Sequence, residues 1–304
     1  MALDIADLVK KVRRIQIVAS KQVDDLLSGE YRSVFRGRGM EFDEVREYTP
    51  GDDVRTIDWN VTARAGKPFI KRFCEERELT VLFAVDVSAS GQFGTTEGSK
   101  FDLAVEVAAL LMLSAQKNND KVGLLLFGED VRGYFPPRKG RAATRRLIRE
   151  LLAAEPKPAS KGETSRPTDL SGALRYLTRV HRRRCVVFLI SDFLDSGDYE
   201  SAMRIARARH DVVAITITDP REAALPAVGF VHLLDPETGE TLEVDTSHAL
   251  VRKQFAALHQ EERKSLEKRL RRLRVDQLPV VNDKSEPYTK SLHRFFRMRE
   301  GRKS

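Results

Sequence analysis

Three oxygen-bearing residues stand at alternate positions directly after an apolar run of strand length. The run covers residues 79–85, and Asp86, Ser88 and Ser90 follow it. In a tight loop, this spacing can turn one carboxylate and two hydroxyls toward the same point. Ligation by oxygen alone favours hard cations such as Mg²⁺, Mn²⁺ or Ca²⁺ over softer metals. The spacing therefore indicates a site for one divalent cation per chain.

Two further oxygen donors are expected to reach the same point. Thr168 comes just before a helical pattern, and Asp192 follows a second apolar run at residues 185–190. The carboxyl ends of neighbouring parallel strands meet at one edge of an open α/β sheet, where such sheets bind ligands. Asp219 closes the next strand, where a role as a cap or turn residue is favoured, and it is otherwise the best candidate for a supporting position behind the ligands. We expect the metal ligands to be Asp86, Ser88, Ser90, Thr168 and Asp192.

The elements that must position these residues alternate along the chain. Short apolar runs alternate with segments whose apolar residues keep helical spacing, which predicts an α/β fold with a mostly parallel sheet and helices on both faces. The expected strands are residues 79–85, 122–127, 185–190 and 212–217, and the expected helices are residues 101–116, 142–153, 170–181 and 199–209.

The flanking segments have a different texture. A helix is predicted at residues 3–27, and a hairpin-rich segment with a turn at Pro50-Gly51 follows it. A hairpin of residues 228–234 and 241–244 is expected at the edge of the sheet. Later, helices are predicted at 248–274 and 288–297, with a mobile basic tail at 297–303. The predicted domains are residues 1–78, 79–245 and 246–304.

Composition limits the class of protein. The chain has 304 residues, of which 41% are hydrophobic and 32% charged, as in soluble globular proteins. Cys74 and Cys185 are the only cysteines, so no disulfide framework is expected. Asp4 and Asp7 interrupt the place where a signal peptide needs an apolar core, and no apolar run approaches the ~18 residues of a membrane span. These features predict a cytoplasmic protein without a membrane span.

The net charge of +8 raises nucleic acid or an acidic membrane surface as possible partners. The basic clusters are at residues 138–146, 179–184 and 268–274. In the last cluster, Leu266 and Leu270 have helical spacing, so its cations form mostly the solvated side of an amphipathic helix. No aromatic stacking pattern accompanies the charge, and nucleic-acid binding is therefore not favoured.

The metal-binding pattern resembles that of a known family. Asp-x-Ser-x-Ser at Asp86–Ser90, with the later Thr168 and Asp192, is similar to the metal-ion-dependent adhesion site of von Willebrand factor A domains over residues 79–234. In that family, a Glu or Asp of a partner protein completes the coordination of the ion. The resemblance implies a von Willebrand factor A-like domain that holds Mg²⁺, Mn²⁺ or Ca²⁺ and binds proteins without catalysis. The loop at residues 91–99 departs from the pattern, either as a gate or as a tolerated insertion.

A second resemblance concerns the segment at residues 39–64. Its run from Gly39 to Arg55, followed by Ile57-Asp58-Trp59-Asn60, is similar to the signature of a bacterial family called domain of unknown function, number fifty-eight. Members are typically encoded beside MoxR-type AAA+ ATPases. The resemblance implies an adaptor or co-chaperone of such an ATPase that acts on a client protein. From the residues themselves, Trp59 and Tyr48 could equally fill a small core or form a contact surface.

Two other functions compete with this interpretation. One is a metal-dependent hydrolase or phosphatase that uses Asp86 as the nucleophile, but such enzymes need a second Asp two residues later, where this chain has Ser88. The chain also lacks a Gly-x-Ser-x-Gly elbow and a His-Glu-x-x-His helix. The other is a basic nucleic-acid-binding protein, whose affinity would fall steeply with salt.

Overall fold

A computed structural model describes residues 41–74, 78–95, 98–156, 167–194, 197–234, 241–283 and 287–302. The predicted helix at residues 3–27 lies outside the described residues. Two compact units are distinguished within the chain. One is formed by residues 35–79, and all described residues from Thr80 onward belong to the other.

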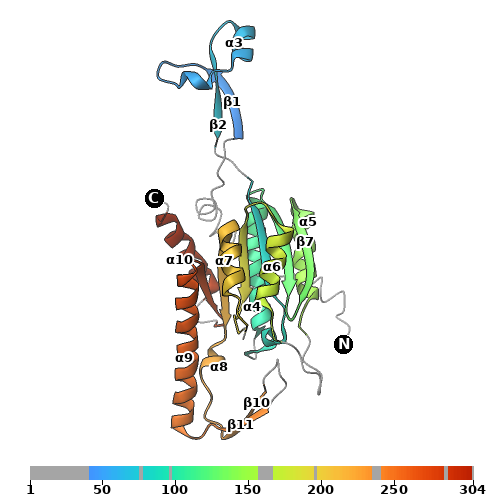
Figure 1. The fold of residues 1–304 in the computed structure, drawn as a ribbon, viewed down its shortest axis with the longest axis vertical. Coiled ribbons are helices and arrows are strands. Elements are labelled where there is room, and N and C mark those ends of the chain that lie inside the picture. The colour runs from blue at the N-terminus through green and yellow to red at the C-terminus, as the bar shows by residue number, and fades with distance from the viewer. Residues whose placement is uncertain are drawn as a thin grey trace. The chain divides into compact units, whose positions relative to one another are not determined.

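The larger unit is built on a six-stranded sheet (Figure 1). Across the sheet, the strands lie in the order β12-β9-β8-β3-β6-β7, and only β7 runs antiparallel to its neighbour. Along the chain these are strands 6-5-4-1-2-3, the order of doubly wound α/β folds. The predicted α/β fold with a mostly parallel sheet is confirmed. The strands are β3 (Thr80–Asp86), β6 (Lys121–Phe127), β7 (Val131–Arg138), β8 (Val186–Ser191), β9 (Asp211–Thr218) and β12 (Asp276–Val281).

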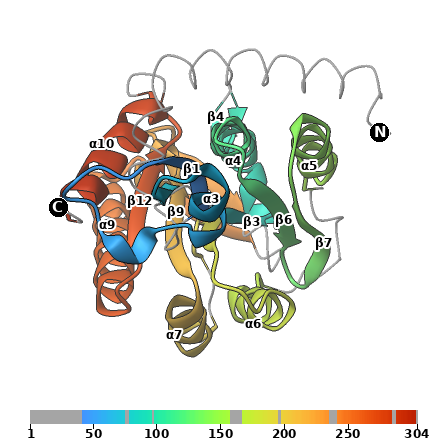
Figure 2. The same cartoon turned by 90° about the horizontal axis from the view of Figure 1, so that it is seen from above.

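Helices cover both faces of this sheet, and Figure 2 shows the two layers. On one face lie α4 (Lys100–Lys117) and α5 (Arg141–Ala153), and on the other lie α6 (Leu170–Val180) and α7 (Glu200–Arg209). Because both faces are covered, the inner strands are apolar throughout. Phe83 of β3 and Phe188 of β8 are fully buried and stack with their ring centroids 5.3 Å apart. This contact packs the middle of β3 against the middle of β8.

The edge of the sheet beside β9 differs from the prediction. The hairpin of β10 (Phe230–Leu234) and β11 (Thr241–Asp245) is present, but it forms a separate two-stranded sheet. The expectation that it lies at the edge of the main sheet was wrong, because β12 pairs in parallel with β9 and occupies that edge. The sheet therefore includes a strand from the segment after residue 245.

Two helices flank β12 in the last part of the chain. They are α9 (Ala249–Arg272) and α10 (Tyr288–Gly301). The prediction of a mobile tail at residues 297–303 was wrong for residues 297–301, which belong to α10. The physical reason is Arg299, whose buried guanidinium lies 2.7 Å from Asp211 and 3.0 Å from Asp276. These ion pairs hold α10 to the starts of β9 and β12.

The smaller unit contains the segment that resembles the family signature. Its strands β1 (Glu41–Glu47) and β2 (Phe69–Cys74) form an antiparallel hairpin, as the sequence predicts. Between them lie a short 3₁₀ helix, η2 (Val54–Thr56), and α3 (Trp59–Ala65), which Asp58 caps. Of the two possibilities for Trp59, the structure has the exposed one, since 70% of its surface is accessible within this unit.

Candidate metal site at the ends of β3 and β8

The candidate site lies where two neighbouring strands of the sheet end. β3 ends at Asp86 and β8 ends at Ser191, and the two strands pair in parallel. The strand order reverses between β3 and β8, because the chain proceeds from β3 to β6 on one side and from β8 to β9 on the other. Open α/β sheets bind ligands at the carboxyl ends of the strands at such a reversal. The fold thus places Asp86 at the position where a ligand is expected.

The loop after β3 turns its polar side chains to one side. Asp86 Oδ1 accepts a hydrogen bond of 2.9 Å from the Ser88 amide, and the Ser88 and Ser90 hydroxyl oxygens lie 2.9 Å apart. Between them, Val87 is fully buried, and its amide donates to the Phe127 carbonyl at 2.7 Å. The alternation of polar and apolar residues in the sequence therefore corresponds to two sides of the loop.

The neighbouring strand β8 contributes a hydroxyl that the sequence analysis missed. Ser191 Oγ donates to Asp86 Oδ2 at 2.7 Å and accepts from the Phe193 amide at 3.0 Å. Asp192 Oδ1 accepts from the Leu194 amide at 3.2 Å. The signal for Ser191 was its place at the end of an apolar strand, directly before Asp192.

These groups line one small cavity of about 20 Å³. A cavity of this size holds about one water molecule or an ion of similar size. Its polar lining consists of the Lys100 side chain and of oxygen-bearing side chains, which belong to Asp86, Ser88, Ser90, Ser191 and Asp192.

Thr168, the fifth predicted ligand, is buried but does not line this cavity. Its neighbour Asp169 donates its amide to the Gly128 carbonyl at 2.8 Å. A Cβ atom added at Gly128 would lie 3.6 Å from the Ser88 Cα atom, so Gly128 lies directly against the loop after β3. The structure therefore brings four of the five predicted residues to one cavity and places Thr168 in the adjacent loop.

A buried lysine also reaches the cavity. Lys100, the first residue of α4, has 3% of its side chain exposed, and its Nζ lies 2.7 Å from Asp192 Oδ2. The same ammonium donates to Glu222. Burial lowers the pKa of Lys100, but the charges of Asp192 and Glu222 outweigh this effect and hold it above its ordinary value. Lys100 lies 92 residues before Asp192, and Glu222 lies 122 residues after Lys100. Sequence spacing could therefore not reveal either residue.

The charges around the cavity sum to an excess of negative charge. Burial, followed by the negative charge of Asp192, raises the pKa of Asp86 to about 6. Within the described residues, Asp86 has no cationic partner, because both of its oxygens accept from uncharged donors. Asp192 and Glu222 share the ammonium of Lys100, so three carboxylates stand against one cation at this site. A buried site with uncompensated negative charge favours a further cation.

The groups behind Lys100 are joined by hydrogen bonds. Asp219 caps the short helix α8 (Pro220–Ala223), and Glu222 bonds the Asp219 amide in return. Asn282, which follows β12, donates its side-chain amide to Asp219 Oδ2 at 2.8 Å and to the Gly98 carbonyl at 3.2 Å. Gly98 lies in a hairpin of β4 (Gly94–Thr95) and β5 (Gly98–Ser99), within the predicted loop at residues 91–99. Asp219 thus connects to the cavity indirectly, through Glu222 and Lys100.

The donor set decides which ions suit this site. Across the described ranges, no three His, Cys, Asp or Glu side chains cluster as metal ligands. An ion in this cavity would therefore depend on serine hydroxyls together with one or two carboxylates. All-oxygen ligation of this kind suits a hard divalent cation.

Comparison with known proteins identifies the family. The family model described as "Protein of unknown function DUF58" matches residues 44–265. The chain belongs to this family. One relative, Uncharacterized protein Rv1480 of Mycobacterium tuberculosis, is 35% identical to this chain over 249 residues. The match covers 82% of this chain and 77% of that protein. Uncharacterized protein YeaD of Bacillus subtilis is 28% identical over 110 residues, or 36% of this chain and 25% of that protein.

Two solved structures resemble the chain at low sequence identity. The conserved hypothetical protein BatB from Bacteroides thetaiotaomicron has a TM-score of 0.44 at 19% identity and covers 74% of this chain and 100% of its own. An aerotolerance-related membrane protein from Bacteroides fragilis has a TM-score of 0.46 at 16% identity, with coverages of 72% and 99%. The chain itself has the predicted α/β fold, with a mostly parallel sheet in the strand order of doubly wound folds. Among its described helices, none combines the length and apolar character needed to cross a membrane.

Proposed function

We propose that this protein is a cation-dependent protein-interaction module. In this proposal, one divalent cation, Mg²⁺ or alternatively Mn²⁺ or Ca²⁺, is bound by Asp86, Ser88, Ser90, Thr168 and Asp192. A carboxylate from a partner protein completes the coordination. The observation that carries the proposal is the single cavity at the ends of β3 and β8, which both aspartates and the two loop serines line.

The bonding within the site supports a prearranged set of ligands. Asp86 is fixed from two sides by the Ser88 amide and the Ser191 hydroxyl, so little ordering remains when an ion binds. Ser88 and Ser90 already lie at hydrogen-bond distance, with both hydroxyls toward the cavity. When bound, the ion would supply an electrophilic position for an outside carboxylate, because neutral hydroxyls leave much of its charge uncompensated.

Lys100 adds a condition to this proposal. Its ammonium is bonded to Asp192, one of the proposed ligands, and a divalent cation beside Asp192 would repel it. The same ammonium also bonds Glu222, which remains available as its counter-ion. We therefore expect ion binding to weaken the bond from Lys100 to Asp192 and to leave the bond to Glu222.

The proposal is non-catalytic. Both carboxylate oxygens of Asp86 accept hydrogen bonds, and the residue two positions later is Ser88, whose hydroxyl bonds Ser90. A phosphatase that used Asp86 as the nucleophile would need an acid two residues later to protonate the leaving group, and Ser88 in that position is not an acid. The residue at position 88 therefore does not favour that chemistry.

The proposed partner is a MoxR-type AAA+ ATPase, for which the protein would act as an adaptor or co-chaperone toward a client protein. This part of the proposal is supported by the resemblance of residues 39–64 to the family signature. The exposed Trp59 of that segment offers a large apolar contact surface.

Calorimetric titration with Mg²⁺ tests the site directly. We expect Ser88→Ala and Asp192→Asn to weaken Mg²⁺ binding by about 10- to 100-fold, because the first removes a hydroxyl ligand and the second removes the carboxylate charge, while both change little volume. Ser201→Ala, at an exposed position on α7, is the matched control and should bind like the wild type. Equal Mg²⁺ affinity in all four proteins would contradict the proposed site.

Capture of the ATPase on immobilised protein, with and without chelator, tests the role of the ion. We expect capture to be lost in chelator and in Ser88→Ala. If Mg²⁺ binding falls in that variant while capture stays the same, the ion is structural and the docking part of the proposal is wrong.

A further inference from the structure

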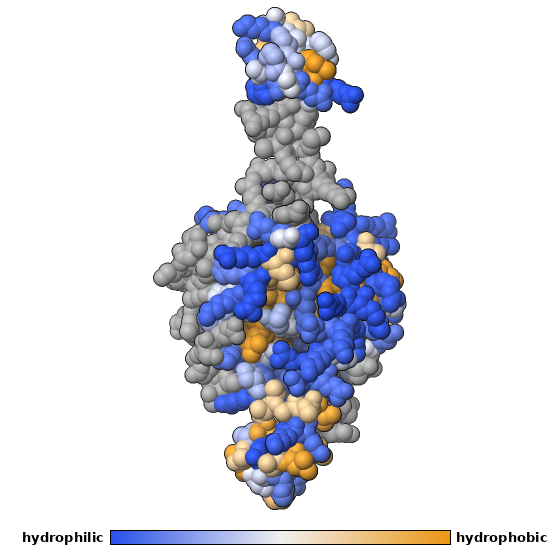
Figure 3. All heavy atoms as spheres, turned by 90° about the vertical axis from the view of Figure 1, so that its left-hand side faces the viewer, coloured by the Kyte–Doolittle hydropathy of each residue, from blue (hydrophilic) through white to orange (hydrophobic). Residues whose placement is uncertain are grey.

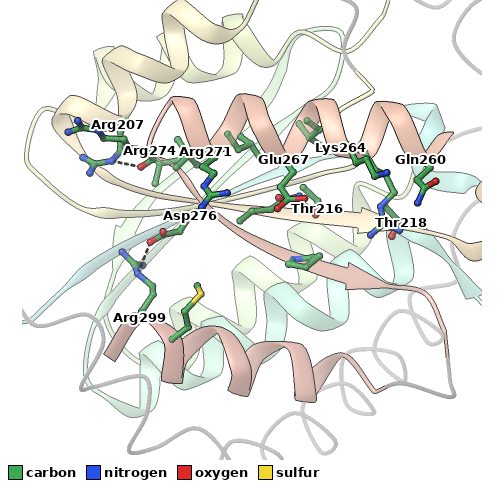
Figure 4. Close-up of a pocket in the computed structure, with 18 of the residues that line it drawn as sticks. Arg207, Thr216, Thr218, Gln260, Lys264, Glu267, Arg271, Arg274, Asp276 and Arg299 are labelled. Carbon is green, nitrogen blue, oxygen red and sulfur yellow. Dashed lines mark hydrogen bonds and ion pairs between the residues drawn. The ribbon is translucent and has the colours of Figure 1, made fainter. Parts of the chain in front are cut away.

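A large groove lies between α9, α10 and the strands β9 and β12, away from the candidate metal site (Figure 4). Its volume is about 1260 Å³. Pockets for small molecules usually have volumes of about 300–1,000 Å³. The groove therefore has room for more than a small ligand.

Both walls of this groove carry polar or charged side chains among apolar ones. A helix that packs on a sheet normally turns an apolar stripe toward it. In α9 this holds only near its end, where Leu266 and Leu270 reach the core. Further back, Gln260 and Lys264 face the strand residue Thr218, as Figure 4 shows. Because polar and charged side chains interrupt the apolar area of both walls, the hydrophobic effect does not close the two surfaces completely against each other.

The charge of the lining is unbalanced. Seven Lys or Arg residues line the groove, against three Asp or Glu residues. Two of the acids, Asp211 and Asp276, are paired with Arg299 and Arg302 of α10. The third is Glu267. The remaining cations, which have no ion pair within the part of the chain that the structure describes, are Arg207, Arg263, Lys264, Arg271 and Arg274.

One of these cations stands at a position that favours glycine. After α9, Arg274 has a φ of 55°, in the left-handed region, and the Val275 amide donates to the Leu270 carbonyl at 3.0 Å. This bonding is that of a Schellman helix end, where glycine is the usual residue. The Arg274 carbonyl also accepts from Arg207 Nε at 2.9 Å. Arg274 thus has a strained backbone conformation at the end of the groove, and its carbonyl binds a second cation of the groove, Arg207.

From this charge and volume, we infer that the groove binds an acidic, extended segment of a partner protein. From Gln260 to Arg271, the helix rises by about 16 Å, which matches about five residues of extended chain. Carboxylates along such a segment would meet the cations on α9 and Arg207. The inference does not depend on the proposed metal site.

The groove favours a peptide over nucleic acid. Proteins that bind single strands usually stack bases on aromatic side chains, and no Phe, Tyr or Trp is among the described residues that line the groove. Figure 3 faces this side of the molecule and shows hydrophilic side chains over much of its described surface. The surface therefore suits charge pairing, without a platform for bases.

Fluorescence anisotropy with a labelled glutamate-rich peptide tests the inference, using the full chain. We expect the wild type to bind this peptide and to bind a matched glutamine-rich peptide at least about tenfold more weakly, because glutamate carboxylates pair with the groove cations and glutamine amides carry no charge. The groove variant combines Arg263→Glu, Lys264→Glu and Arg271→Glu. It should lose at least about tenfold in affinity for the glutamate-rich peptide.

The control variant makes the same charge change on α5, through Arg141→Glu, Arg145→Glu and Arg149→Glu at exposed positions. It should bind like the wild type. Equal loss in both variants would mean attraction by net charge alone and would overturn the inference, as would no binding to the wild type. A single-stranded oligonucleotide that binds more tightly than the peptide, and only with the groove intact, would identify nucleic acid as the ligand instead.

The neutral variant Lys264→Gln with Arg271→Gln is the second test, because it leaves no new charges to disturb folding. Its thermal unfolding, followed by circular dichroism, should match that of the wild type. Its affinity for the peptide should fall severalfold, and unchanged affinity in this folded variant would overturn the inference.

Discussion

The metal site and the groove along α9 treat charge in opposite ways. At the ends of β3 and β8, three carboxylates and one ammonium are enclosed by the protein, and Lys100 has only 3% of its side chain exposed. In the groove, five cations face solvent with one carboxylate, Glu267, among them. At 4 Å, two charges interact by about 1 kcal/mol in water but by about 4 kcal/mol at the effective dielectric constant of about 20 that suits sites within a protein. Enclosed charges must therefore be compensated by opposite charges within the fold, whereas solvent-exposed charges can remain unpaired until a partner binds.

Removal of Lys100 should give the largest effect. Lys100→Met leaves Asp192 and Glu222 without their shared cation, and we expect the free energy of unfolding in chelator to fall by about 3–5 kcal/mol. Lys264→Met, in the open groove, should change it by less than about 0.5 kcal/mol. Denaturant unfolding of both variants checks the contrast. Equal losses of stability in the two variants would show that the cost of removing a lysine does not depend on its burial. Added Mg²⁺ should stabilise Lys100→Met more than the wild type.

Within the groove, Arg299 should behave like a buried charge. It pairs with Asp211 and Asp276 and has 8% of its side chain exposed, so Arg299→Met should lower the free energy of unfolding by about 2–4 kcal/mol. Arg302, with 62% of its side chain exposed, is the matched control, and Arg302→Met should cost less than about 1 kcal/mol. Denaturant unfolding of the two variants measures this difference in stability. A small effect at Arg299 would mean that α10 is held mainly by its apolar contacts.

Asp86 offers a test with the opposite sign. Burial and the charge of Asp192 disfavour its ionised form, since its pKa is raised to about 6. Asp86→Asn should therefore raise the free energy of unfolding at neutral pH in chelator by about 1–2 kcal/mol, while it abolishes the response to Mg²⁺. Thermal unfolding with and without Mg²⁺ measures both effects. Destabilisation in chelator would mean that the Asp86 charge is compensated by a group other than those described.

A change in salt concentration should produce the smallest effect, and it should affect the groove and the metal site differently. Surface attraction is screened over about 8 Å at physiological ionic strength, so peptide binding in the groove should weaken severalfold as salt is raised. The destabilisation caused by Lys100→Met should change little over the same range, because its partners are enclosed. Anisotropy and denaturant titrations at several salt concentrations compare the two. Peptide binding that is insensitive to salt would mean that contacts other than charge pairs dominate.

The inner part of the sheet could be predicted from the sequence, but its two edges could not. The inner strands are continuous apolar runs, because helices cover both of their faces. The edge strands β7 and β12 carry prolines, at Pro136, Pro137 and Pro279, and proline usually argues against a strand. An edge strand tolerates proline because one side of its backbone has no strand to pair with.

Like the sheet, the candidate site could be predicted only in part from the sequence. Asp86, Ser88 and Ser90 are close in sequence, and Asp192 follows an apolar strand, so their meeting follows from the order of the strands. Lys100 could not be recognised, because its two partners come from distant loops that meet only in the folded sheet. Arg299 was missed for the same reason, and its basic surroundings resembled a mobile tail.

The position of Asn282 links the metal site to the groove. Its side-chain amide bonds Gly98, two residues before Lys100, and its backbone amide donates to Thr218, which lines the groove. A movement of the segment at Gly98 therefore has to break a bond to Asn282 or be transmitted to the strand beside the groove. By thermodynamic reciprocity, if a cation at one end alters the affinity for a peptide at the other, the peptide alters cation affinity by the same factor.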